Sequence, residues 1–219
     1  MTFDEIFKTS LVFVHFFASA VALATILRAD FLILTHFTSK LSPKACARIH
    51  SAKSVVSGAL MVLWLTGIMI CVHGYMHDPS YVLNQKLWMK VLVVLTLSVN
   101  GWFLHRFAFH AIQPGARLSD ALPRQRMILT LMACLSSSSW VFACFLGIAR
   151  ALNNRENFAG VMEAYLVMLA VNIAVGLMLT ALLARLQKRG ALHGTRREPR
   201  LLEALKRRAS DWQESELQV

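Results

Sequence analysis

Histidine and lysine side chains stand inside long apolar runs of this 219-residue chain, where they are the groups best able to do chemistry. His15 lies within the run 11–17, and Lys90 follows Trp88 and Met89 about one turn into a later run. An unpartnered imidazole is costly in lipid, so His15 needs a hydrogen-bond partner, a metal or a haem iron. Lys90 either extends to the interface or faces the helices, where it would pair with a carboxylate or a haem propionate. Lys90 is therefore the candidate catalytic residue.

Further histidines lie near the ends of the apolar runs, in an outer and an inner layer. The outer layer pairs His15 with His73, and the inner layer pairs His105 with His50. Imidazole is a common axial ligand and an apolar bundle excludes water from a macrocycle, so these four histidines are candidate ligands of haem b. Within the runs themselves, no HExxH motif or short histidine pair occurs, and a zinc-protease centre is not expected.

Copper is the alternative occupant of the outer layer, where His15 and His73 would be metal ligands. Thioether sulfur suits Cu(I), and the chain contains ten methionines. The candidate residues of this layer are His15, Met61, Met69, His73, Met76 and His77.

Five apolar runs must position these residues, and each is long enough for a helix to cross a bilayer core of about 30 Å. Only 16% of residues are charged and 56% are hydrophobic, which excludes an ordinary soluble domain. Continuous apolar runs also exclude the alternating pattern of a membrane barrel. We predict an all-α, polytopic bundle of five transmembrane helices. The expected spans are 11–27, 55–72, 87–104, 128–148 and 161–183.

Charge predicts the orientation of the bundle. Most of the 23 lysine and arginine residues lie in the first connection, the third connection and the tail after Leu183. The positive-inside rule then places the amino terminus outside and the carboxyl terminus in the cytoplasm. We expect a bundle over 1–184 and a basic cytoplasmic tail over 185–219, with a surface helix at 198–212 that binds anionic headgroups. The membrane topology accounts for the excess of basic over acidic residues, so no nucleic-acid partner is expected.

Other polar residues in the runs have structural explanations. We expect Arg28 and Asp30 to stop the first helix at the interface, and Lys86 and Glu163 to be interfacial. The run 136–139 is four serines, which can bond carbonyls of their own helix and let a neighbouring helix approach. We expect these serines to pack helices rather than to line a cavity.

The third apolar run resembles a group of small bacterial inner-membrane proteins that includes the HemJ-type protoporphyrinogen oxidases and the CopD-like copper-resistance proteins. The shared pattern is a helix that opens W-x-x-K or W-x-K and closes in His, after a first helix with an early His. Here Trp88 and Lys90 match the opening and His105 matches the close. His15 is the early histidine, Gly67 stands near the end of the second run, and the likeness covers residues 10 to 150.

The resemblance implies an inner-membrane bundle that binds haem b, with His15 as an axial ligand and Lys90 as a functional lysine. Its electrons would come from a membrane donor, and a quinone or a redox protein would be the partner. A homo-oligomer or a larger complex suits so small a bundle. HemJ-type proteins carry a Pro-Arg pair near the end of helix one, where this chain has Arg28-Ala29-Asp30. We therefore expect a relative of these proteins rather than a HemJ-type enzyme.

Three functions follow from these patterns. The first is a haem-b membrane protein acting in electron transfer or a small oxidoreduction. The second is a non-enzymatic assembly or accessory subunit, in which the polar residues serve helix packing. The third is the handling of copper or another small ion. The sequence leaves open whether the chain is an enzyme, and it contains no nucleotide-binding or hydrolase motif.

Overall fold

The computed structural model describes residues 2–108, 112–149 and 158–216, and among them there is no strand. The predicted all-α class is therefore confirmed for this part of the chain. The chain divides into two compact units, residues 1–180 and 181–219. The candidate site residues all belong to the first unit.

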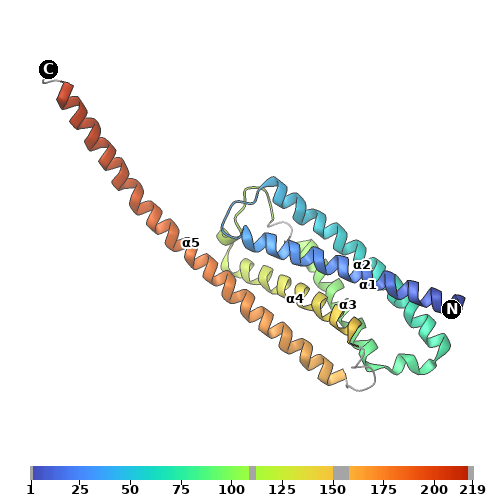
Figure 1. Ribbon diagram of the computed structural model, residues 1–219. Coiled ribbons are helices and arrows are strands. Elements are labelled where there is room, and N and C mark those ends of the chain that lie inside the picture. The colour runs from blue at the N-terminus through green and yellow to red at the C-terminus, as the bar shows by residue number, and fades with distance from the viewer. Residues whose placement is uncertain (1, 109–111, 150–157, 217–219) are drawn as a thin grey trace. The chain divides into compact units, whose positions relative to one another are not determined.

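Five helices of the described ranges are long and apolar enough to cross a membrane, as predicted, which makes the chain a multi-pass membrane protein (Figure 1). They are α1 (Phe3–Thr35), α2 (Pro43–His77), α3 (Gln85–Phe103), α4 (Pro123–Ile148) and α5 (Phe158–Glu216). A π-helix, η2 (Leu104–Ala108), continues α3, and two 3-10 helices, η1 (Pro79–Leu83) and η4 (Leu118–Asp120), lie in the connections. The segment 198–212 falls within α5, and its binding to a membrane surface stays a prediction.

Side-chain caps fix where the first three long helices begin. Thr2 and Glu5 form a capping box at the start of α1, in which each side chain bonds the other residue's backbone N–H. The Ser42 hydroxyl accepts from the Ala45 N–H at the start of α2, and Asn84 caps α3 through the Lys86 N–H. The capping box brings the acidic residues of the amino terminus into the first turn of α1.

Helices α1 and α2 run well beyond the spans expected for them, 11–27 and 55–72. The expected stop of α1 at Arg28 and Asp30 is wrong, because α1 continues to Thr35. Neither residue breaks a helix, and the apolar segment 31–34 continues the pattern beyond them. Likewise α2 continues beyond residue 72 to His77, and it ends because Pro79 holds the preceding Asp78 in an extended conformation.

Backbone hydrogen bonds tie the first and third connections together. The Leu41 N–H donates to the Ala116 carbonyl over 3.0 Å, and the Gly115 N–H donates to the Leu41 carbonyl over 2.8 Å. Gly115 has a φ of +84°, which favours glycine at this turn. Farther along, the Ser119 N–H donates to the Phe37 carbonyl over 3.0 Å. The two connections therefore lie at the same end of the bundle, as a chain that crosses back and forth requires.

The interior of the first unit contains a large apolar cluster, and the outer surface of the unit is apolar as well. The cluster is formed by Ala18, Ala22, Ala59, Leu63, Met89, Val93, Leu97, Trp140, Phe142, Leu146, Val161 and Tyr165. Large apolar side chains such as Phe13, Met61 and Trp102 are more than half exposed on the outside. Lipid is the solvent that matches such a surface.

Polar side chains join α4 to the first part of α5. The Asn172 amide donates to the Ser138 hydroxyl over 2.8 Å and to the Ser137 hydroxyl over 3.2 Å. The Ser139 hydroxyl, which is fully buried, lies 2.7 Å from the Tyr165 hydroxyl. These contacts confirm that the serine run packs helices.

Candidate functional site

His15 is held against α2 by one hydrogen bond. Its Nδ1 lies 2.7 Å from the Thr66 hydroxyl oxygen. That hydroxyl donates its own hydrogen to the Val62 carbonyl over 2.6 Å, so its oxygen accepts from the imidazole. Nδ1 therefore carries the proton, and Nε2 of the neutral ring carries a lone pair. Within the part of the chain that the structure describes, Nε2 of His15 has no hydrogen-bond partner.

Gly67 of α2 lies beside the His15 ring. A Cβ at Gly67 would lie 3.6 Å from Cε1 of His15, at ordinary van der Waals distance, so the ring is a direct neighbour of this part of α2. Thr66 is buried beneath it. The predicted need of His15 for a partner is met by a neutral hydroxyl on the next helix.

Lys90 is half-buried on α3. Its charge interacts with His15 on α1 and with the Cys71 thiol on α2. Among the described residues its ammonium makes no hydrogen bond and no ion pair. Lys90 and the free nitrogen of His15 therefore bring a cation and a lone pair to one region inside the bundle.

His73 lies in a different group at the end of α2. Its Nε2 is 2.8 Å from Oδ1 of Asp4, and Nε2 of His77 is 3.2 Å from Oδ2 of the same carboxylate. The residue that binds His15 is Thr66, seven positions before His73, which corresponds to about 10 Å along a helix. The structure does not bring His15 and His73 together as a facing pair.

The inner pair is also separated. His105, in the π-helix after α3, has its Nε2 3.3 Å from the Ser57 hydroxyl of α2. His50 is exposed, seven residues before Ser57 and about 10 Å away along α2. The ligand roles of His50, His73 and His105 stay predictions.

A cavity of about 350 Å³ lies beside His105, and its lining is mostly apolar. Its charged and imidazole members are Asp30, Lys53, His105 and Arg126, and Ser136, Ser137 and Asn172 line it from α4 and α5. Cavities of roughly 300–1,000 Å³ hold small ligands. The serine run thus lines a cavity as well as packing helices, so the expectation that it would not line a cavity is wrong.

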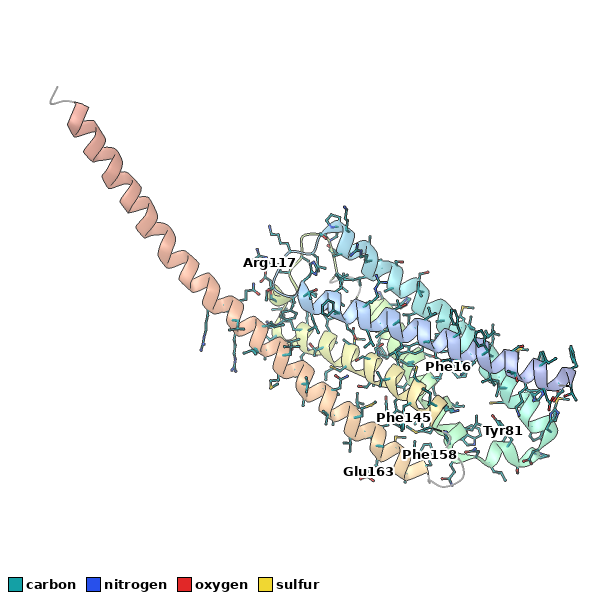
Figure 2. The ribbon with its side chains drawn as sticks, in the orientation of Figure 1. Phe16, Tyr81, Arg117, Phe145, Phe158 and Glu163 are labelled. Carbon is teal, nitrogen blue, oxygen red and sulfur yellow. The ribbon has the colours of Figure 1, made fainter. Side chains whose placement is uncertain are left out.

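Asp30 and Lys86 lie against the protein interior, which the expectation of interfacial positions did not include. Asp30 lines the cavity, and in the described ranges its carboxylate has no hydrogen bond or ion pair. Lys86 is buried, and its ammonium donates to the Ala149 carbonyl at the end of α4. Glu163 is exposed on α5, where Figure 2 labels it. Helix rotation decides these positions, and sequence spacing alone does not reveal it.

The fold and these sites define a multi-pass, all-α membrane protein with ionisable residues inside its bundle. No family model, curated protein sequence or solved structure matches the chain. The likeness to HemJ-type and CopD-like proteins therefore rests on the residues quoted above.

Proposed function

We propose that the chain holds haem b between its transmembrane helices and serves in membrane electron transfer or a small oxidoreduction. The observation that supports this proposal is the free Nε2 of His15, whose ring is fixed through Nδ1 by Thr66. Histidines that bind metals almost always donate their other ring N–H to a protein acceptor, which fixes the tautomer and the ring orientation.

Two neighbours of His15 support the proposal. Gly67 lies beside the ring without a side chain, and Lys90 supplies a cation that would pair with a propionate. Bound haem would supply one-electron chemistry at its iron. The residues of the chain would orient the axial imidazole, neutralise the propionate and exclude water.

Only His15 is assigned to the iron in this proposal. His73 is bonded to Asp4 about 10 Å along α2 from Thr66, so it does not face His15 across a macrocycle. A bacterial inner-membrane location, a quinone or redox-protein partner and self-association belong to the same proposal. The resemblance supports the location and the electron partner.

A spectrum of the detergent-purified full-length protein tests the proposal. We expect a Soret band, a sharp alpha band in the reduced form and about one haem per chain in a pyridine haemochrome assay. His15→Ala should remove most of the haem, because it deletes the axial ligand. His36→Ala, at the carboxyl end of the same helix, should retain it. Imidazole added to His15→Gly should restore the Soret band if the ring acts as a ligand rather than as a packing group.

A colourless protein, expressed with haem supplied, would overturn the proposal. Full haem content in His15→Ala would overturn the ligand role alone. A colourless protein would leave two functions: the accessory subunit, in which His15 and Lys90 serve helix association, and the handling of copper or another small ion.

A further inference from the structure

A second group of candidate metal ligands lies where the first turn of α1 meets the last turn of α2. Asp4, His73 and His77 each offer one ligand atom, and these three atoms lie within 4.8 Å of one another. The extension of α2 beyond its apolar run produces this group, because it puts His73 and His77 four residues apart on one helix face. Their rings stack with centroids 4.4 Å apart.

The tautomer of His77 requires a positive centre in this group. Nδ1 of His77 lies 2.9 Å from the His73 carbonyl oxygen, which can only accept, so Nδ1 carries the proton. Nε2 of the neutral ring then directs a lone pair at Oδ2 of Asp4, 3.2 Å away. Two lone pairs repel at this distance unless a proton or a metal ion lies between them.

The distances suit a metal ion. Neighbouring ligand atoms of a tetrahedral zinc site, with bonds of about 2.0–2.1 Å, are about 3.3 Å apart. The two imidazole-to-carboxylate distances are 2.8 and 3.2 Å. The His73 carbonyl orients the His77 ring, and the Phe7 ring lies beside His73 with centroids 6.1 Å apart. Small side-chain rotations would bring all three ligand atoms to one ion.

We propose that Asp4, His73 and His77 form a binding site for a divalent transition-metal ion, Zn²⁺ or Cu²⁺, that joins α1 to α2. Two imidazoles and a carboxylate favour these ions over Cu(I), which prefers thiolate and thioether. The His73 side chain is 13% exposed, whereas those of His77 and Asp4 are 58% and 51% exposed. The ion therefore has three protein ligands and an open position for water or an external ligand.

Zn²⁺ titration by calorimetry tests the site on the full-length protein, purified without a polyhistidine tag and treated with EDTA. We expect one saturable site per chain. The double variant His73→Ala/His77→Ala should bind more than about 100-fold more weakly, because loss of even an outer-shell partner costs about 10–100-fold. Asp4→Asn preserves the shape of the side chain and should weaken binding by at least about 10-fold. His50→Ala, an exposed histidine on the same helix, should bind as the unchanged protein does.

Two results would overturn the site. One is the lack of saturable one-to-one binding of both Zn²⁺ and Cu²⁺ by the unchanged protein. The other is unchanged affinity in Asp4→Asn with its helical circular dichroism intact. Asp4→Asn keeps the test decisive if the double histidine variant does not fold. His15→Ala should leave Zn²⁺ affinity unchanged, and loss of the Zn²⁺ site should leave the haem spectrum unchanged. The metal site and the haem proposal can therefore fail separately.

Discussion

The Thr66 hydroxyl determines which nitrogen of His15 is available to a ligand. It donates a hydrogen bond to the Val62 carbonyl and accepts one from the Nδ1–H of His15, so the free lone pair of the ring is on Nε2. His77 is oriented in the same way by a backbone carbonyl of its own helix. At the residue scale, both proposed sites depend on the partner of the nitrogen that does not bind the ligand.

Replacement of Thr66 should therefore affect the haem proposed at His15. Thr66→Val keeps the shape of the side chain but removes the acceptor for Nδ1–H. We expect haem affinity to fall by about 10–100-fold, as for other outer-shell partners, and the reduction potential to shift. Haem titration and redox potentiometry measure the two effects.

Thr96→Val is the matched control for Thr66→Val. Among the residues that the structure describes, the Thr96 hydroxyl bonds only the Leu92 carbonyl of its own helix, over 2.9 Å. Equal haem affinity in the two variants would contradict the role given to Thr66.

At the scale of helices and turns, the proposed metal site depends on the last turn of α2, which carries His73 and His77. Gly74 lies between His73 and His77, and a Cβ there would meet the Tyr81 ring at 2.8 Å. Figure 2 labels Tyr81 in the turn that follows α2. The Asp78 carboxylate accepts hydrogen bonds from the Ser80 hydroxyl over 2.7 Å and from the Ser80 backbone N–H over 2.9 Å. These bonds lower the pKa of Asp78. The turn is thus fixed by a close aromatic contact and by a capped carboxylate.

Gly74→Ala should destabilise the protein although alanine favours helices. The gain in helix propensity is about 0.5–1 kcal/mol, while crowding of a packed contact typically costs about 1–3 kcal/mol. Gly58→Ala is the control on the same helix, since a Cβ there meets nothing within 4 Å, and it should stabilise. Thermal unfolding in detergent measures both changes. If Gly74→Ala raised the melting temperature as much as Gly58→Ala, the Tyr81 contact would have no energetic importance.

At the scale of the whole molecule, the two ends of the bundle differ in the charged and titratable residues that they carry. The first and third connections, which carry many of the basic residues, are tied together at one end through Leu41, Gly115 and Ala116. The start of α1 and the end of α2 meet through Asp4 and His73. The positive-inside rule predicts that the first of these ends is cytoplasmic.

Cysteine labelling tests this orientation. In a variant without the four native cysteines, Ser80→Cys should react with a membrane-impermeant maleimide on intact cells. Gln113→Cys should react only after permeabilisation, because it lies in the basic third connection. Both positions are exposed, and both should react in detergent. The reverse pattern on intact cells would invert the predicted topology.

The class of fold and the number of spans were readable from the sequence, because the length of an apolar run and its lack of charge are local properties. The same local reasoning singled out His15 and Lys90 as ionisable groups in apolar runs. It also predicted the helix packing of the serine run. The spacing of His73 and His77 was legible too, but only the structure shows that α2 extends past its apolar run and brings both beside Asp4.

Only the tertiary structure revealed which side chains meet. His15 and Thr66 are 51 residues apart, and His73 and Asp4 are 69 residues apart. The rotation and register of each helix set such contacts, and both arise from many small packing energies summed over several helices. The same rotations direct Asp30 into a cavity and bury Lys86 at the end of α4. The lengths of the apolar runs therefore determined the helices, whereas the non-local packing of their faces decided the sites.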